Sequence, residues 1–462
     1  MKIKLHWQVL IALGLAVVAG ALSMKGLFFE AETTDFAHYI QRWLEGATGL
    51  GVDQKLLGFS MVPVYQFVGE LFLNALKMVV VPLIAASVIT SIAGMGTTTG
   101  LGRLGLKTIA FYFISSFFAI LVGLAAVNLL QPGYIDGQPA NKVLKIQAEM
   151  SPELKGKITN RKPGEIRDTL VNIVPQNVIA TASDNRKMLS LIVFSILFAV
   201  FMTRISDRYR QAQLDFWQGL FEIMMQITHF IMKFAPLGVF GLVAGVVAGL
   251  EAEKFADMFS IIWAFFLTAL AALAFHAFVT IPLILKFVAR VSPLRHFVAM
   301  RNALLTAFST SSSSATLPVT IECIEENAGV SKRTASFVLP LGATVNMDGT
   351  ALYECVAVMF IAQVFGIPMT FGDQFIIVAF ALMTSIGVAG VPSASLFAIM
   401  IIAQYIDPTG TLFAGIAIIY FVDRPLDMLR TSVNVLSDST AAVTIAKLEG
   451  ENQVLQTVPE QR

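Results

Sequence analysis

The chain has 462 residues, of which 56% are hydrophobic and 14% are charged, and its mean hydropathy is +0.73. Soluble globular domains carry about 25% charged residues, so the composition argues against water as the main solvent of this protein. The net charge of +1 provides no electrostatic footprint for nucleic acid. The two cysteines, Cys323 and Cys355, stand alone in apolar stretches, which excludes a disulfide scaffold.

Apolar segments long enough to cross a bilayer follow one another after the N-terminus. A membrane-spanning helix needs about 20 apolar residues. Because further spans follow, the first segment is predicted to be an uncleaved helix rather than a signal peptide. Lys2 and Lys4 predict a cytoplasmic N-terminus by the positive-inside bias. The predicted spans are residues 7–24, 62–95, 104–130, 188–202, 214–247 and 258–289, and the polar segment 132–187 is predicted to be an external loop.

After Pro293 the apolar stretches become short and are interrupted by polar residues. Residues 301–308 lead into six consecutive serines and threonines at 309–314, and residues 375–383 lead into a second polar stretch. Each flank is too short to cross a bilayer alone, so each unit is predicted to be a hairpin that enters the membrane and turns back. Such paired interruptions point to a transporter site. The longer elements that alternate with the hairpins are residues 335–365 and 412–446.

The serine run at 309–314 would be a flexible linker in a soluble protein. Between apolar half-spans, its hydroxyl groups and turn amides are instead suitable donors for a carboxylate ligand. The alternative is a membrane-embedded hydrolase that uses one of residues 311–314. No Gly-x-Ser-x-Gly elbow surrounds these serines and no base is signalled nearby.

A polar stretch from Gly342 to Thr350 interrupts the middle of the next apolar element. Glycine, asparagine and aspartate are poor helix formers, so we expect an unwound segment that presents carbonyl groups and the carboxylate of Asp348. These are hard oxygen ligands that suit an alkali cation, and the alternative is a buried polar contact between helices. Glu354 is a candidate for carrying a proton, because an ionisable group inside a span is a functional hypothesis by default.

The last element carries charged residues on one helical face. Five polar residues recur at intervals of four, three, four and four, which places them within a sector of roughly 80°. They are Asp423, Asp427, Arg430, Asn434 and Asp438. Pro425 is a potential helix break, so the phase is secure only from Asp427 onward. A guanidinium group can grip a carboxylate through two hydrogen bonds, so Arg430 is predicted to select an acidic side chain. Apolar neighbours disfavour the alternative, a charged surface face.

Together these motifs resemble the dicarboxylate/amino acid:cation symporter family, which contains glutamate, aspartate and neutral amino acid transporters. The most specific motif is the string Asn-Met-Asp-Gly-Thr at 346–350. The resemblance covers nearly the whole chain. The other segments that carry it are residues 77–82, 111–116, 310–318, 351–354, 390–392 and 427–438.

The resemblance implies an all-α polytopic membrane protein with eight transmembrane helices and two re-entrant helical hairpins in inverted repeats. It also implies a homotrimer in the cell (inner or plasma) membrane, in which an inner transport unit slides like an elevator against an outer scaffold. The implied divisions are two mainly scaffold helices at 1–103, the third helix of the transport unit at 104–131, the external loop at 132–187, scaffold helices four and five at 188–257, the transport core at 258–446 and a cytoplasmic tail at 447–462. The core would contain the sixth helix, hairpin 1, the seventh helix, hairpin 2 and the eighth helix.

The resemblance assigns substrate contacts by motif position. The implied ligands are Arg430 and Thr350 for the side-chain carboxylate, Asp427 and Thr431 for the ammonium group, and Asn434 with the backbone of Ser312 and Ser313 for the α-carboxylate. Gly390 and Val391 would lie in hairpin 2, which would close over the site as a gate.

Sodium would be the transported coupling ion, with no organic cofactor. The resemblance implies a first sodium site at Asp438 with the backbone of Gly342, Asn346 and Asn434. A second would use the backbone of Thr344, Ser385, Ile386 and Val388 beside Met347. A third would use Tyr112, Ser115, Ser116, Asn346 and Asp348.

The chain departs from the family at one point. Relatives usually carry a second arginine beside the substrate, at the position of Ser311 or of Met428, and this chain has neither. We hypothesise that Arg424, one turn before Met428, substitutes for it and neutralises Asp427 when the site is empty. The departure leaves potassium counter-transport open, whereas Glu354 remains the candidate for proton coupling.

The sequence therefore predicts secondary active uptake of glutamate or aspartate coupled to sodium, with protons as a second candidate ion. The alternatives within the family are a proton-coupled dicarboxylate transporter and a neutral amino acid transporter, and neutral-substrate relatives lack an arginine where Arg430 stands. An anion channel would show current without substrate accumulation. The expected partners are the amino acid substrate, membrane lipids and the other protomers, with neither nucleic acid nor enzymatic activity.

Overall fold

The computed structural model describes residues 5–23, 62–94, 102–144, 174–183, 188–248, 250, 252–387, 395–406 and 412–456. These residues are helical apart from one two-stranded hairpin and short connections, which confirms the predicted all-α class.

The first half of the chain contains two long uninterrupted helices, α3 (Val62–Gly94) and α4 (Gly102–Leu130). The other helices of this half are α1 (Leu5–Leu22), α5 (Ala140–Leu144), α8 (Val178–Ala182), α9 (Met188–Met202), α10 (Asp207–Met232) and α11 (Ala235–Ala248). Strands β1 (Tyr134–Ile135) and β2 (Gln138–Pro139) pair antiparallel. They lie within the segment predicted to be an external loop.

The second half carries the interrupted elements. They are η3 (Ala252–Lys254), α12 (Phe255–Phe275), the π-helix η4 (His276–Thr280), α13 (Ile281–Phe287), α14 (Pro293–Thr310), α15 (Ser313–Glu322), the π-helix η5 (Cys323–Asn327), α16 (Lys332–Val345), α17 (Asp348–Phe365), α18 (Phe371–Gly387), α19 (Ser395–Ile406) and α20 (Phe413–Leu448).

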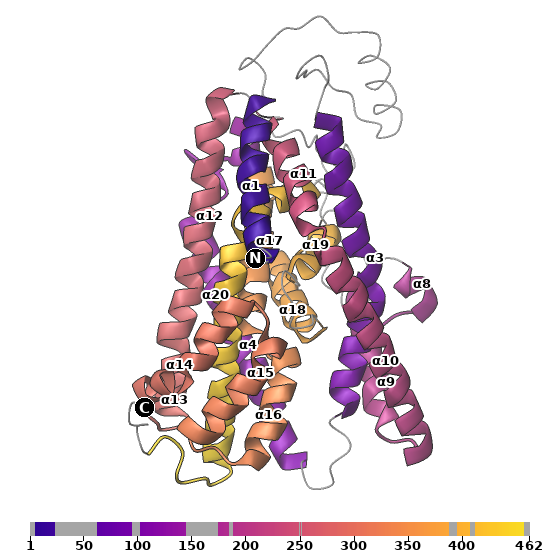
Figure 1. The fold of residues 1–462 in the computed structure, drawn as a ribbon, viewed down its shortest axis with the longest axis vertical. Coiled ribbons are helices and arrows are strands. Elements are labelled where there is room, and N and C mark those ends of the chain that lie inside the picture. Colours follow the sequence, from indigo (N-terminus) through magenta and orange to yellow (C-terminus); the bar gives the residue numbers. More distant parts are fainter. Residues whose placement is uncertain are drawn as a thin grey trace, which may run out of the picture.

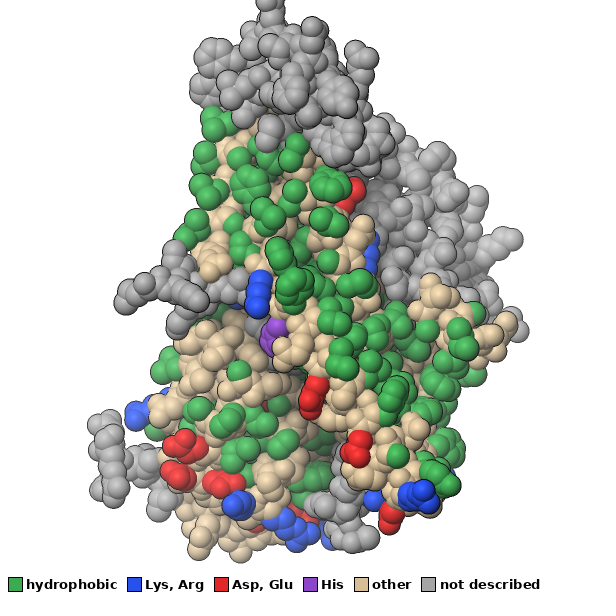
Figure 2. Space-filling model, turned by 45° about the vertical axis from the view of Figure 1, so that its right-hand side comes forward, with side chains coloured by type: hydrophobic (Ala, Val, Ile, Leu, Met, Phe, Trp, Pro, Cys, Tyr) green, Lys and Arg blue, Asp and Glu red, His purple; other side chains and the backbone are tan. Residues whose placement is uncertain are grey.

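Four helices among the described residues are long and apolar enough to cross a membrane. They are Val62–Ala93, Arg103–Leu130, Phe255–Phe287 and Lys332–Phe365. Large apolar side chains such as Leu129, Trp263 and Phe278 are exposed on these helices. Hydrophobic side chains cover the middle of the face in Figure 2, and charged side chains gather at its lower end. The chain is therefore a multi-pass membrane protein, as its composition indicates.

The predicted span at 214–247 is bent in the structure. Helices α10 and α11 are bent by 54° at a short break. Pro236 lies at the start of α11. A proline has no backbone N–H group to donate a hydrogen bond, and its ring clashes with the preceding turn of a helix. Lys233 and Phe234 accordingly bond to carbonyl groups three residues earlier instead of four. The apolar pattern runs across this break, because hydropathy does not register a change in helix direction.

The helices form two groups that meet (Figure 1). In the first group, α1 packs on α11, and α11, α10 and α9 all pack on α3. In the second group α17 lies at the centre, packed against α4, α12, α18, α19 and α20. All 18 residues of α17 are buried, so its polar residues must find partners inside the protein.

Two pairs of helices in the second group pack against each other, α14 with α15 and α18 with α19. The chain reverses between α14 and α15 at Ser311, which is left-handed with φ 51°, and Ser312, which is extended. The turn therefore falls in the predicted serine run. The helices α14 and α18, with 18 and 17 residues, are longer than the predicted flanks 301–308 and 375–383. Arg301 and Asn302 in α14, and Asp373 and Gln374 in α18, interrupt the apolar run without ending the helix.

Candidate functional site

The long element Lys332–Phe365 is interrupted inside the predicted stretch 342–350, but only at Asn346 and Met347, because residues 342–345 and 348–350 remain helical. Helix α16 ends at Val345, and α17 begins at Asp348. Between them, Asn346 (φ −103°, ψ 80°) and Met347 (φ −111°, ψ 61°) leave the helical region. Asp348 therefore lies in the first turn of α17, where the positive end of a helix dipole favours a carboxylate.

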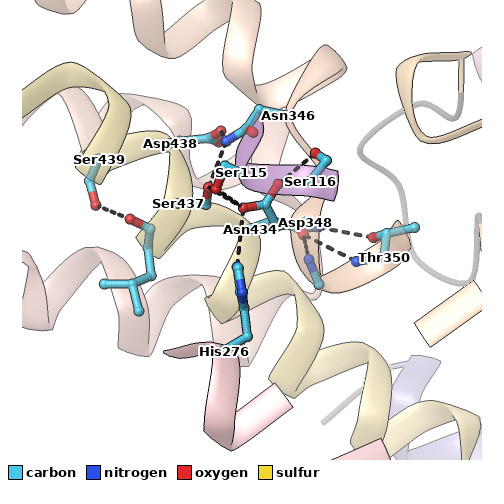
Figure 3. Close-up of polar contacts among 12 residues, drawn as sticks. Ser115, Ser116, His276, Asn346, Asp348, Thr350, Asn434, Ser437, Asp438 and Ser439 are labelled. Carbon is cyan, nitrogen blue, oxygen red and sulfur yellow. Dashed lines mark hydrogen bonds and ion pairs between the residues drawn. The ribbon is translucent and has the colours of Figure 1, made fainter. Parts of the chain in front are cut away.

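Asp348 is the centre of a buried polar network (Figure 3). Ser116 and Ser437 each donate a hydrogen bond to its carboxylate at 2.6 Å. Ser115 donates a third. The Nε2 atom of His276, from the π-helix η4, lies 3.2 Å from Oδ2. Four side chains from α4, η4 and α20 thus converge on one carboxylate.

The network continues to a second buried carboxylate, Asp438. The amide of Asn346 donates to Asp438 Oδ1 at 2.9 Å and to Ser437 Oγ at 3.0 Å, while Asn346 Oδ1 is buried and has no hydrogen-bond partner among the described residues. A Cβ atom on Gly342 would lie 2.5 Å from Asp438 Oδ1 and 2.9 Å from the hydroxyl of Tyr112. Only glycine allows this approach. The result is a cluster of carboxylate, amide and hydroxyl oxygens, the ligand type that hard cations prefer.

Helix α20 continues through Pro425 without a break, so the predicted interruption does not occur and the polar face includes Asp423. Arg430 is 1% exposed. Its Nε and Nη2 atoms donate to Asp427 Oδ1 at 3.0 and 2.7 Å, and Nη1 donates to Asp423 Oδ1 at 3.1 Å. Its guanidinium carbon lies 4.4 Å from the ring centroid of Tyr353. Both edges and one face of the cation are therefore occupied.

Asp427 is shared by two arginines. Its Oδ2 atom accepts a hydrogen bond from Arg424 Nη1 at 3.0 Å, on the side away from the Oδ1 contact with Arg430. Tyr353 donates to Asp423 Oδ1 at 3.0 Å. Two carboxylates and two guanidinium groups balance each other in charge, which lowers the cost of burying four ions together.

Asn434 joins α20 to the start of α17. Its Oδ1 atom accepts from the backbone N–H groups of Gly349 and Thr350 at 2.8 and 3.3 Å, and its amide donates to Thr350 Oγ1 at 3.0 Å. A Cβ atom on Gly349 would lie 2.5 Å from the carbonyl oxygen of Arg430. The two helices therefore touch through their backbones beside Arg430.

A profile of the family described as "Sodium:dicarboxylate symporter family" matches residues 5–448. The chain belongs to this family. It is 32% identical over 451 residues to the "Proton/sodium-glutamate symport protein" of Geobacillus stearothermophilus, covering 97% of this chain and 96% of that one. It is 31% identical over 452 residues to the "Proton/glutamate-aspartate symporter" of Escherichia coli K12, covering 97% and 93%. It is 35% identical over 424 residues to human "Excitatory amino acid transporter 3", covering 83% and 79%. The resemblance stated from the motifs is thus confirmed.

In this sodium:dicarboxylate symporter family member, part of the implied first and third sodium sets forms one network through Asn346 and Ser437, which connects Asp438 with Asp348, Ser115 and Ser116. Tyr112 instead donates to the carbonyl oxygen of Val338 at 2.7 Å, and Asn434 bonds to Gly349 and Thr350. Residues of the implied second set lie on α16 and α18, which contact each other. Met347 and Ser385 are buried there, and Thr344 Oγ1 accepts a hydrogen bond from Ser91 at 3.4 Å. Ile386 lies in α18. The three remaining predicted residues, Val388, Gly390 and Val391, lie outside the described residues.

The hairpin tip and Glu354 flank the charged face. Ser312 caps α15 by accepting a hydrogen bond from Ala315 N at 3.2 Å, and Ser313 is the buried first residue of that helix. Thr431 donates to the carbonyl oxygen of Asp427 at 2.7 Å. Glu354 is buried, with Oε2 accepting from Thr384 at 2.8 Å, and its Oε1 atom has no partner in the part of the chain that the structure describes.

Sequence reasoning missed His276, Ser437, Tyr353 and Thr384 as members of these networks. Ser437 directly precedes Asp438, which is a usable signal. His276 lies more than 70 positions from Asp348, in a π-helix that no local pattern announces. Its contact depends on how α12 packs against α17 and α20.

Proposed function

We propose that the chain is a secondary active symporter that takes up glutamate or aspartate together with sodium, with protons as a further coupling ion. The observation that carries the proposal is the fully buried Arg430, held among Asp423, Asp427 and Tyr353 next to the Asp348–Asp438 network. Buried charges inside membrane proteins mark substrate and ion pathways. The relatives named as glutamate symporters support the same substrate class.

Substrate binding would work by exchange of ionic partners. Arg430 has both edges occupied by Asp427 and Asp423, so a substrate carboxylate must displace one of them. Displacing Asp427 frees a carboxylate for the substrate ammonium group, with Thr431 beside it. Thr350, Asn434 and the amides at Ser312 and Ser313 complete the proposed contacts to the two substrate carboxylates.

Arg424 is proposed to neutralise Asp427 in the empty site. Its 3.0 Å contact with Asp427 Oδ2 supports this role. Because Arg424 supplies a resident cation, the site has a means of balancing Asp427 without potassium. Counter-transport of potassium is therefore not part of the proposal.

Sodium coupling would follow from shared helices. Asn434 and Asp438 are one turn apart on α20, and Asn346, Asp348 and Thr350 occupy the break and the first turn of α17. A cation that rearranges the Asp348–Asp438 network also shifts the backbone that holds Thr350 and Asn434. Burying two carboxylates costs free energy, and a bound cation lowers that cost by neutralising their charge. Ion binding should therefore favour the arrangement of Thr350 and Asn434 that binds substrate.

Proton coupling is assigned to Glu354. It lies on α17, one turn beyond Thr350, and its Oε1 atom has no partner among the described residues. A buried carboxyl with one free oxygen can take up a proton without breaking the hydrogen bond from Thr384.

For the architecture we propose eight transmembrane helices and two re-entrant hairpins, α14–α15 and α18–α19, in a homotrimer with a cytoplasmic N-terminus. The divisions stated above, at 1–103, 104–131, 132–187, 188–257, 258–446 and 447–462, remain part of the proposal. The packing of α1, α3, α9, α10 and α11 as a group apart from the site-bearing helices supports a scaffold and a sliding unit. Hairpin 2 is the proposed gate.

Uptake of radiolabelled aspartate and glutamate into proteoliposomes tests the proposal, with sodium and proton gradients imposed separately. We expect accumulation driven by a sodium gradient, and no competition from neutral amino acids, because Arg430 needs an acidic partner. No accumulation under any gradient would refute the proposal. Current without accumulation would identify an anion channel instead.

A further inference from the structure

The described chain does not end with α20. Residues 449–456 leave the helix and fold back against the bases of the site-bearing helices (Figure 1, lower left). We call them the C-terminal clasp. Val454 and Leu455 within it are only 2% and 4% exposed, although the segment as a whole is polar. A free polar tail would leave both side chains in solvent.

The far end of the clasp is bonded to α14 and to the connection between η5 and α16. The backbone N–H of Leu455 donates to the carbonyl oxygen of Ala328 at 2.9 Å. Arg295 Nη1, at the start of α14, donates to the carbonyl oxygens of Leu455 and Gln456 at 3.2 and 3.3 Å. On the side of the clasp, these hydrogen bonds involve backbone groups rather than side chains, so they fix the path of its backbone.

The middle of the clasp caps α16. The Glu451 carboxylate accepts three hydrogen bonds, from the backbone N–H and the hydroxyl of Ser331 at 2.8 and 2.6 Å and from Thr334 Oγ1 at 2.7 Å. Ser331 is the N-cap of α16. An anion at this end is favoured by the unpaired N–H groups and the helix dipole.

The near end of the clasp is bonded to α4. Lys107 Nζ donates to the carbonyl oxygen of Leu448 at 2.9 Å and to the Glu449 carboxylate at 2.5 Å. Arg103 lies 3.9 Å from the same carboxylate. Within the described part of the chain, the clasp thus joins α4, α14, α16 and α20.

Three of these helices carry the polar network at a distance from the clasp. At about 1.5 Å of rise per residue, Ser115 lies roughly 12 Å along α4 from Lys107, Asn346 lies roughly 18 Å along α16 from Thr334, and Asp438 lies roughly 15 Å along α20 from Leu448. The fourth, α14, leads to the Ser311 turn. Fixing the bases of rigid helices limits how far their ligand atoms can shift against one another.

We infer that the C-terminal clasp sets sodium affinity by holding α4, α14, α16 and α20 in register, with Glu451 as its main positioning residue. The inference rests on the proposed sodium-coupled function. The mechanism is indirect, because no clasp residue belongs to the Asp348–Asp438 network. It acts through the packing of these helices, because the ligand atoms at their far ends must keep their relative positions to bind an ion.

The test is the sodium concentration that gives half-maximal initial aspartate uptake in proteoliposomes. Glu451→Ala should raise it by about 2- to 30-fold, the range of couplings carried through packed elements, with the maximal rate at saturating sodium nearly unchanged. Glu451→Gln, which keeps an acceptor oxygen for the hydroxyl groups, should raise it less. Glu253→Ala, which removes an exposed glutamate of η3, is the matched control and should behave as wild type.

An unchanged half-saturation in Glu451→Ala would overturn the inference, and so would a loss of maximal rate alone. Hydrogen–deuterium exchange of the detergent-solubilised protein tests the clasp without transport. Glu451→Ala should speed exchange of the amides of residues 346–351 relative to Glu253→Ala, and equal rates would also overturn it. If the wild type accumulates no substrate, the proposed function fails, while the exchange experiment still judges the clasp.

Discussion

A Cβ atom at Gly342 would collide with the carboxylate of Asp438, so Gly342→Ala is a sharp perturbation of the cation network. The new Cβ would lie 2.5 Å from Asp438 Oδ1 and 2.9 Å from both Asp438 Cγ and the Tyr112 hydroxyl. The carboxylate cannot simply swing away, because Asp438 is buried and Asn346 holds the same oxygen at 2.9 Å. The substitution must therefore displace Asp438, Asn346 or α16 itself.

The magnitude follows from packing. Adding one carbon to a full core costs about 1–3 kcal/mol, and the better helix propensity of alanine offsets about 1 kcal/mol of this in overall stability. The propensity gain does not restore the ligand geometry. If the whole packing cost falls on the cation network, sodium affinity drops by about 5- to 150-fold at 1.4 kcal/mol per factor of ten.

The assay is sodium-dependent aspartate uptake in proteoliposomes, with Gly219→Ala in α10 as the control. A Cβ at Gly219 meets nothing within 4 Å, so this variant gains helix propensity without crowding and should match wild type. Gly342→Ala should need much more sodium, with aspartate affinity at saturating sodium close to wild type. If both variants show the same sodium dependence, the Asp438 network is not a sodium site.

Three further predictions concern the charged residues. Arg430→Cys should weaken aspartate uptake by about 30-fold or more, since truncating a buried charge contact costs about 2–5 kcal/mol; wild-type aspartate affinity would show that Arg430 is not the selector. Arg424→Ala should reduce the uptake rate by about tenfold or more, because it leaves Asp427 with one cationic partner, and a wild-type rate would refute the compensation hypothesis. The hydrogen bond from Lys107 holds the pKa of the Glu449 carboxyl below its ordinary 4.5. A lowered pKa stabilises the fold above the ordinary value, and that stabilisation is lost as the pH falls through the lower one. Acidification from about pH 5 to about pH 3 should therefore lower the unfolding temperature of wild type more than that of Glu449→Gln, and equal decreases would contradict this.

Local properties of the sequence determined where most helices lie and which residues share the polar face of α20. Apolar runs predicted the described helices that are long enough to span a membrane, and the poor helix formers within 342–350 indicated the break between α16 and α17. The spacing of Asp427, Arg430, Asn434 and Asp438 was sufficient to predict that they share one face of a helix. These features depend on neighbours within a few turns, which is the range that propensity and periodicity report.

Only the tertiary structure decided which helices meet. The contact of His276 with Asp348, the hydrogen bond from Tyr353 to Asp423 and the approach of Gly342 to Asp438 all join residues far apart in the chain. Packing also overrode local signals, since α20 continues through Pro425 and the polar residues 449–456 are held against α14 and α16. The physical reason is the same in each case. A buried polar group must find its partner wherever the fold provides one, and sequence spacing does not record that place.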